Sequence, residues 1–334
     1  MPTVYYHLSA YVSHRNAGLL HKQALRTAGV PLTDNPQAAD IVILHDDPLV
    51  YADLLAQNPH WAAVPKIAYA VWETENLPAP YHAALQAIDS IWTCSSFARD
   101  ALAPAGKPVH VVPHVVKPPL PSGEDLRTVR AYLGECPPTS FFFYTIADSY
   151  NPRKNLMGLL EIYNAHCARY PHTYLVVKQY RANLNLSKLP WLISIEADLS
   201  TGQISALHQL CHCYVSAHHS EAWGLSLSDA MAHGKPVIAT GYSGNQDFMT
   251  GDNSFPVNYR LEPVSALMCE VLPLFTPNMR WAQPDPNHMG YLLRKVRRTY
   301  PCATVTKKAQ QSMRAYCPEN IGALMCALLQ NPCG

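Results

Sequence analysis

Two carboxylates stand eight positions apart in the segment HHSEAWGLSLSDAM, which spans residues 218–231. The segment follows an apolar run that we expect to be a strand, and it opens a predicted helix. Glu221 precedes that helix, and Asp229 lies inside it. Carboxylate oxygens accept hydrogen bonds from hydroxyl groups. One of the two could therefore bind a ribose while the other faces a second sugar.

The residues between the two carboxylates could bind an anion. The backbone amides of Gly224, Leu225 and Ser226 would be free donors at the N-terminus of the helix, where negative charge is favoured. Gly224 has no side chain, so a ligand can approach its backbone closely. The alternative interpretation is an ordinary helix start with Ser220 or Glu221 in the N-cap box.

Cationic side chains occupy two other predicted strand ends. The segment IADSYNPRKN places Arg153 and Lys154 side by side where a helix is expected to begin, although the helix dipole disfavours cations there. A bound diphosphate would offset that conflict, and a guanidinium can grip it through two hydrogen bonds. Lys178 ends the predicted strand 174–178. A solvated basic loop and a surface lysine are the alternatives. Because ligands of α/β proteins bind at the carboxyl edge of the sheet, the three segments together predict a nucleotide site.

The elements that must position these residues form two alternating series. Short apolar strands separated by helices favour parallel sheets. In the first series we expect strands at 4–8, 41–44, 66–72, 90–93 and 109–112, a turn at 16–18 and a helix at 19–28. The stiff, polar segment KPPLPSG at 117–123 is typical of a domain boundary. In the second series we expect helices at 124–133, 156–170, 204–210 and 225–233 and strands at 141–146, 174–178, 213–217 and 236–239, and a last helix at 319–329.

The second half resembles the retaining glycosyltransferases of family 4, which share the GT-B fold. Their hallmark is a Glu-x7-Glu motif in a context like SEGFGLxxxEAMAxGxPVIAT, and this chain reads SEAWGLSLSDAMAHGKPVIAT at 220–240. The similarity continues through GYSGNQDFM at 241–249, and a bacterial subgroup is similar in NPRKN at 151–155 and WAQPD at 281–285. It covers residues 65–330 and is strong over 141–290.

The resemblance implies a fold and a set of roles. The fold would be α/β, with two doubly wound Rossmann-like domains facing each other across a cleft. We expect an acceptor-binding domain at 1–120, a nucleotide-sugar-binding domain at 121–316, and a helix in 317–334 that packs back on the first domain. By this resemblance, Lys154, Arg153 and Lys178 would bind the diphosphate, and Glu221 would contact the donor sugar. The backbone of Gly224, Leu225 and Ser226 would contact the phosphates and the sugar. Asp229 would bind the ribose.

Two positions depart from the family pattern. Asp229 replaces the usual second glutamate, so its reach is one methylene shorter. Asp148 occupies a place where many members carry an arginine, which leaves Arg153 as the second cation.

The acceptor candidates lie in the first domain. Val71–Glu75 is similar to a WE…P segment that faces the cleft in relatives, so Trp72 and Glu73 are expected to contact the acceptor. The alternative is a core tryptophan beside a capping glutamate. Gly18, in the predicted first strand-to-helix turn, and His114, near the domain boundary, are further candidates.

Composition excludes some partners. Lys plus Arg is 25 and Asp plus Glu is 24, so bulk charge does not favour a nucleic-acid partner.

We expect a cytoplasmic protein, because no apolar run has the length of a membrane span and no signal-peptide pattern precedes the first strand. A basic cluster could still touch the inner face of a membrane peripherally; it consists of Arg294, Lys295, Arg297 and Arg298.

A zinc site is the main metal alternative. Six histidines and cysteines crowd one stretch: His208, Cys211, His212, Cys213, His218 and His219. Their spacing does not match zinc knuckles, and alternate side chains of a strand diverge. We therefore expect no metal and no cofactor, with lysine and arginine supplying the positive charge.

The predicted activity is metal-independent transfer of a hexose-like sugar from a UDP- or GDP-linked donor, with retention of anomeric configuration. The acceptor would be a hydroxyl of a glycan, a lipid-linked molecule or a protein. The alternatives are a nucleotide-sugar epimerase or phosphorylase on the same fold, and a non-catalytic nucleotide-sugar-binding subunit.

Overall fold

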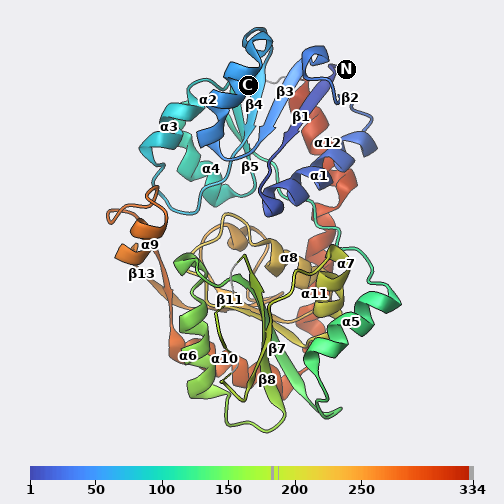
Figure 1. The fold of residues 1–334 in the computed structure, drawn as a ribbon, viewed down its shortest axis with the longest axis vertical. Coiled ribbons are helices and arrows are strands. Elements are labelled where there is room, and N and C mark those ends of the chain that lie inside the picture. Colours follow the sequence, from blue (N-terminus) through green and yellow to red (C-terminus); the bar gives the residue numbers. More distant parts are fainter. Residues whose placement is uncertain (182–183, 187, 331–334) are drawn as a thin grey trace. The chain divides into compact units, whose positions relative to one another are not determined.

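The computed structural model describes residues 1–181, 184–186 and 188–330. The chain divides into two compact units (Figure 1). The N-terminal unit comprises Met1–Val116 with the chain from Ala315 onward, and the C-terminal unit comprises Lys117–Arg314.

A parallel sheet forms the centre of the N-terminal unit, with strand order β2-β1-β3-β4-β5-β6. The strands are β1 Val4–Leu8, β2 Leu32–Thr33, β3 Ile41–His45, β4 Lys66–Tyr69, β5 Ser90–Thr93 and β6 Val109–Val111. The helices are α1 Val12–Thr27, α2 Tyr51–Gln57, α3 Ala79–Leu85, α4 Ser96–Leu102 and α12 Pro318–Leu329. All five residues of β3 are buried, as expected for an unbroken apolar run covered by helices on both faces.

The first helix differs from its prediction. The segment 16–18 was expected to be a turn, but α1 begins at Val12, so Gly18 lies inside the helix and is buried. A Cβ on Gly18 would come within 2.6 Å of the Leu8 side chain and 3.0 Å of His45 Nδ1. The glycine therefore marks a close approach of helix to sheet rather than a turn.

The last helix packs on the first. Helices α1 and α12 lie side by side, so the end of the chain completes the N-terminal unit (Figure 1). Gly322 of α12 makes this approach possible, because a Cβ there would overlap the backbone carbonyl oxygen of Ala24 in α1 and lie 2.9 Å from its carbon.

A second parallel sheet forms the centre of the C-terminal unit, with strand order β12-β11-β10-β7-β8-β9. Its strands are β7 Phe141–Asp148, β8 Thr173–Tyr180, β9 Leu192–Ile195, β10 Cys213–Ser216, β11 Val237–Thr240 and β12 Phe255–Val257. An antiparallel hairpin, β13 Tyr259–Pro263 and β14 Arg280–Pro284, is separate from this sheet. The helices are α5 Gly123–Leu133, α6 Leu156–His166, α7 Thr201–Leu210, α8 Leu225–Ala232, α9 Ala266–Val271, α10 Pro286–Thr299 and α11 Ala303–Met313.

Several boundaries differ from the sequence predictions. Strand β4 ends at Tyr69 rather than residue 72, β8 runs on to Tyr180, and α6 ends at His166 rather than residue 170. The carboxyl edge of the second sheet therefore lies two residues beyond Lys178.

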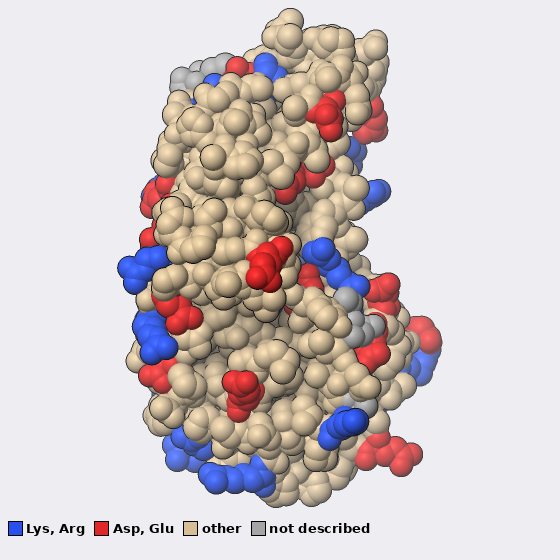
Figure 2. Space-filling view, turned by 60° about the vertical axis from the view of Figure 1, so that its left-hand side comes forward, with Lys and Arg blue, Asp and Glu red and all other residues tan. Residues whose placement is uncertain are grey.

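Both units are parallel-sheet α/β domains of the Rossmann-like kind, as predicted. Within the described residues, every helix is too short or too polar to cross a lipid bilayer. On the face shown in Figure 2, charged side chains of both signs are interspersed among neutral ones.

The packing of α12 on α1 gives a stability prediction. Gly322→Ala should lower the free energy of unfolding by about 2 kcal/mol, because the added methyl meets rigid backbone and overpacking outweighs the helix propensity of alanine. The matched control is Gly123→Ala at the first turn of α5, where the nearest atom to a new Cβ is the Arg127 guanidinium at 3.8 Å. Urea denaturation measures both. Equal stabilities of the two variants would contradict the close approach of the two helices.

Candidate active site

One carboxylate joins two loops at the carboxyl edge of the second sheet. Glu221 Oε1 accepts from Lys154 Nζ at 2.5 Å, and Glu221 Oε2 accepts from Arg153 Nη1 at 3.2 Å. The side chains of Arg153, Lys154 and Glu221 are 10%, 26% and 12% exposed. The two cations and the first carboxylate of the motif therefore form one largely buried cluster, which we call the Glu221 ion cluster.

The cations do not begin a helix as predicted. Arg153 and Lys154 belong to a short 3-10 turn, η5 Pro152–Lys154, and α6 starts only after Asn155, which adopts a left-handed conformation with φ 51°. Asn155 Nδ2 donates to the Ala217 carbonyl oxygen at 2.9 Å. This bond ties the η5 turn to the end of β10 and sets the cations beside Glu221.

The backbone of Glu221 is held on its other side by the loop after β11. Glu221 N donates to Ser243 Oγ at 2.8 Å, and Gly244 N donates to the Glu221 carbonyl oxygen at 2.9 Å. Ser243 has φ 72°, an unusual value for a residue with a side chain, and it precedes the 3-10 turn η6 Gly244–Asp247. The segment GYSGNQDFM thus contributes a structural support for Glu221 that the sequence did not assign to any residue.

His219 connects the η5 turn to the β13–β14 hairpin. Its backbone N donates to the Arg153 carbonyl oxygen at 2.8 Å, and its carbonyl oxygen accepts from Ala282 N at 3.0 Å. Its Nδ1 lies 2.7 Å from the Ala282 carbonyl oxygen, and its ring stacks on Trp281 with centroids 4.2 Å apart. The WAQPD segment therefore braces the ion cluster, a role that only its proximity in space reveals.

The two motif carboxylates have opposite charge behaviour. Burial opposes ionisation of Glu221, but the charges of Lys154 and Arg153 outweigh it and lower the pKa of this carboxyl to about 2. At Asp229 burial is the cause, and it raises the pKa to about 7. The Asp229 side chain makes no hydrogen bond or ion pair with any residue of the described part of the chain, and it lies inside α8. The Asp229 carboxyl therefore titrates near neutral pH.

Helix α8 begins at a glycine rather than at a capping side chain. Gly224 is the N-cap with φ 98°, and no side chain bonds to the first-turn amides, so the capped-helix alternative with Ser220 or Glu221 is wrong. A Cβ at Gly224 would come within 2.6 Å of Leu227 Cδ1. Leu225 and Ser226 follow at the helix start and are half-buried. The amides of the first turn therefore have no capping side chain, and their contact with a ligand stays a prediction.

Lys178 lies deeper than expected. It sits within β8 rather than at its end, is 1% exposed, and donates from Nζ to the Gln179 carbonyl oxygen. Burial lowers the pKa of its ammonium group, and Asp198 partly offsets this. The contact of Lys178 with a diphosphate stays a prediction. Arg153 and Lys154, in contrast, lie next to each other and both contact Glu221.

Trp72 has the surroundings of a core residue. It is 1% exposed, its Nε1 donates to Thr74 Oγ1 at 2.7 Å and to the Asn76 carbonyl oxygen at 2.8 Å, and its ring meets Tyr81 edge-on. This favours the core alternative over direct acceptor contact. Glu73 beside it is half-buried, and its acceptor role stays a prediction.

His114 is part of an aromatic cluster in the N-terminal unit. It lies 3.3 Å from Tyr69 Oη and stacks on His21 with centroids 5.7 Å apart. Burial lowers its pKa well below the usual value, and His21 adds to the effect, so the imidazole is neutral near pH 7. Gly18 is buried in α1 and His114 is buried as well, and contact of these two residues with the acceptor stays a prediction.

Three histidines of the zinc alternative have separate partners. His208 Nδ1 lies 2.7 Å from Tyr144 Oη, His212 Nδ1 accepts from Phe142 N at 3.0 Å, and His218 lies between Ser216 and Asn245. Among the described residues, no three His, Cys, Asp or Glu side chains come together in a way that could hold a metal ion.

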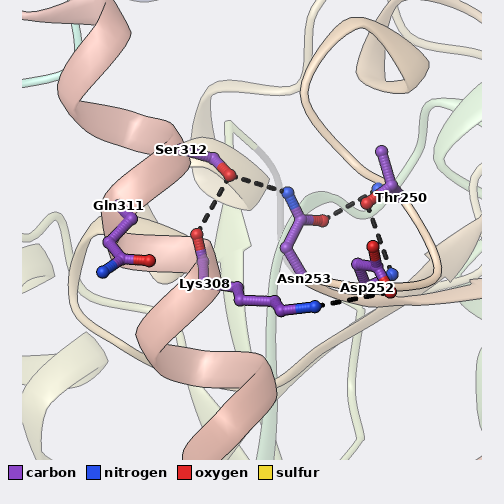
Figure 3. Close-up of a pocket in the computed structure, with 6 residues that line it drawn as sticks. All are labelled: Thr250, Asp252, Asn253, Lys308, Gln311 and Ser312. Carbon is purple, nitrogen blue, oxygen red and sulfur yellow. Dashed lines mark hydrogen bonds and ion pairs between the residues drawn. The ribbon is translucent and has the colours of Figure 1, made fainter.

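A polar hollow of about 300 Å³ lies apart from the ion cluster, between the loop at 250–253 and α11 (Figure 3). Its inner wall is Asn253, which donates from Nδ2 to Ser312 Oγ at 3.0 Å and to the Phe248 carbonyl oxygen at 2.9 Å. Phe248 in turn packs on Trp223 of the motif, with ring centroids 4.6 Å apart. These contacts join the loop at 250–253 to α11 and, through Phe248, to Trp223 of the motif.

The family comparison covers the region that holds this site. Residues 143–254 match the model described as glycosyl transferases group 1, which includes the η5 turn, the motif and the loop after β11. No curated protein matches the sequence significantly.

Solved structures of glycosyltransferases share the fold of the chain. Sucrose-phosphate synthase from Thermosynechococcus elongatus gives a TM-score of 0.68 at 12% identity, covering 99% of this chain and 98% of that one. Anabaena HepE in complex with UDP and glucose gives a TM-score of 0.67 at 14% sequence identity. The match covers 99% of this chain and 100% of HepE. The pneumococcal O-GlcNAc transferase in complex with UDP and GlcNAc gives a TM-score of 0.60 at 12% sequence identity, and this chain covers 59% of the length of that protein. The fold is therefore that of the GT-B glycosyltransferases, and the family match supports an enzyme that uses a nucleotide sugar.

The opposite pKa shifts predict opposite stability effects. The pKa of Asp229 is raised on folding, so its contribution is fully present below about pH 4 and is lost as pH rises towards 7. The stability of Asp229→Asn relative to the parent should therefore rise between pH 5 and pH 8 by about 2 kcal/mol. This value takes about 1.4 kcal/mol per pH unit and reduces the sum because the side chain is partly exposed.

Glu221→Gln is the internal control for that measurement. The pKa of Glu221 is lowered, so its contribution is present above about pH 4.5 and is lost only as pH falls towards 2. The variant should be less stable than the parent by the same amount at pH 6 and at pH 8. Urea unfolding of the three proteins at each pH decides, and a pH-independent effect of Asp229→Asn would contradict the burial of its carboxylate.

Proposed function

We propose that the protein is a retaining, metal-independent glycosyltransferase of the family 4 kind, which moves a hexose-like sugar from a nucleoside-diphosphate donor to a hydroxyl acceptor. The observation that carries the proposal is the Glu221 ion cluster. Two cations converge at the carboxyl edge of a parallel sheet, beside a helix N-terminus and within the region that matches the glycosyltransferase model.

Each donor group would have a partner in the C-terminal unit. Lys154 and Arg153, assisted by Lys178, would bind the diphosphate. The amides of Gly224, Leu225 and Ser226 would bind the phosphates and sugar, Asp229 the ribose, and Glu221 the donor sugar. The UDP bound to HepE and to the pneumococcal enzyme favours a UDP-linked donor over a GDP-linked one.

The reaction would proceed by attack on one face of the sugar. The acceptor oxygen bonds to the anomeric carbon as the bond from that carbon to the phosphate oxygen breaks. The diphosphate leaves with the electron pair and takes the proton of the acceptor hydroxyl. Lys154 and Arg153 would stabilise the charge that grows on the leaving group, the type of interaction that contributes most in many enzymes. The acceptor is a hydroxyl of a glycan, lipid-linked molecule or protein, and Glu73 of the N-terminal unit is proposed to contact it.

Two alternatives predict different products. An epimerase or phosphorylase would convert the donor without this acceptor chemistry, and a binding subunit would leave the donor intact. Incubating a UDP-sugar with and without candidate hydroxyl acceptors separates them: a transferase releases UDP faster when its acceptor is present and forms a new glycoside. An epimerised sugar or an untouched donor would contradict the proposal.

Lys154→Ala tests the diphosphate assignment. Removing one electrostatic stabiliser should lower turnover by about 100-fold. The fold should persist, because Lys154 lies in the η5 turn outside the core and Arg153 still pairs with Glu221. Lys307→Ala, on the exposed surface of α11, is the control and should retain parent activity. Steady-state rates of UDP release measure both, and near-normal turnover of Lys154→Ala would refute the assignment.

Metal independence has its own test. If the cations of the protein neutralise the leaving group, EDTA should leave the rate of transfer within about twofold of the untreated enzyme, since no metal ion supplies that charge. Loss of activity in EDTA that Mg²⁺ or Mn²⁺ restores would show that a metal does this work instead.

A cytoplasmic location and peripheral contact with a membrane are further proposals. Of the basic cluster in α10, Arg298 is exposed and Arg294, Lys295 and Arg297 are half-buried, and α10 contains no acidic residue. Such a cluster suits an anionic lipid surface, where each cation contributes about 1 kcal/mol.

A further inference from the structure

The carboxylate of Glu221 contacts the two cations to which the proposed function assigns the diphosphate. Both of its oxygens are engaged, one by Lys154 and one by Arg153. In the proposed function these same two cations bind the donor diphosphate. The carboxylate and the diphosphate would therefore compete for the same donors.

Hydrogen bonds to neighbouring loops hold the backbone around the cluster, whereas the two cations hold the Glu221 carboxylate. The Glu221 backbone is held by Ser243 and Gly244. Arg153 is held through its Nη1, which donates to the Ser220 carbonyl oxygen at 2.6 Å, and through its carbonyl oxygen, which accepts from His219 N. Rotation about the side-chain bonds of Glu221 would move its carboxylate away while Arg153 keeps its hydrogen bond to the Ser220 carbonyl oxygen.

Charge favours the exchange. In this largely buried site two cations share the single negative charge of Glu221. The diphosphate of a nucleotide sugar carries two negative charges and neutralises the pair more fully. Once displaced, the carboxylate is repelled by the phosphates and is free to accept hydrogen bonds from sugar hydroxyls.

We propose that Glu221 is the internal counter-ion of the diphosphate site: it holds Arg153 and Lys154 in the donor-free protein, and the donor binds by displacing it. The inference rests on the proposed function, because it takes the two cations as the diphosphate site. It adds that the glutamate weakens diphosphate binding while it serves the sugar. The donor-free cations thereby keep an anionic partner.

Calorimetric binding of inorganic pyrophosphate in metal-free buffer tests this exchange. Glu221→Gln removes the competing charge and should bind pyrophosphate about 10-fold more tightly than the parent. Glu221→Ala removes the same charge without a side-chain amide and should show the same gain, so the test survives if one variant folds poorly. In Glu221→Gln, the added change Lys154→Ala should abolish the gain.

Asp229→Asn is the matched control, because it removes a motif carboxylate that does not contact the cations. It should leave pyrophosphate binding unchanged but weaken the binding of UDP by about 10-fold, since UDP carries the ribose. Equal or weaker pyrophosphate binding by the neutral Glu221 variants would overturn the counter-ion role alone. Failure of pyrophosphate to bind any of the proteins would overturn the diphosphate site and, with it, both proposals.

Discussion

The contact of Glu221 with Arg153 and Lys154 is the interaction on which the site depends. It links residues nearly seventy positions apart, 153 and 221, across the ends of β7 and β10. Two adjacent cations in a half-buried turn would repel each other and attract water, and a single carboxylate between them removes that cost. Because each partner is also fixed through the backbone, by Asn155, His219, Ser243 and Gly244, the charges hold a defined geometry.

The same motif carries a second carboxylate in an opposite electrostatic state. Asp229 is only eight residues from Glu221, but it faces no cation and is held by α8 in a poorly solvated place, so its pKa is raised instead of lowered. Two carboxylates of a single motif can thus differ in charge state, because one is ionised throughout the physiological range and the other titrates near neutral pH. The division arises from their neighbours, since their chemical types are nearly identical.

The support behind the motif comes from elements that carry no chemistry of their own. The β13–β14 hairpin fixes His219 by backbone pairing and by the stacking of Trp281. The loop at 248–254 fixes Trp223 through Phe248 and is tied by Asn253 to α11. Rigid outer contacts of this kind are what keep charged groups in one arrangement when no ligand is bound.

The sequence alone determined the class of fold and the region of the site. Apolar runs such as Ile41–Leu44 must be buried strands, helical stretches between them require parallel pairing, and a glycine between Glu221 and Asp229 marks a strand-to-helix junction, because these signals are local. Which side chain faces which was decided by tertiary structure. Trp72 and Gly18 were expected near a ligand but are packed inside the N-terminal unit, and Lys178 is covered because β8 continues past it. The pairing of Glu221 with the cations could not be predicted either. The energy of a buried charge depends on its burial and on contacts with distant loops, and neither follows from the spacing of residues along the sequence.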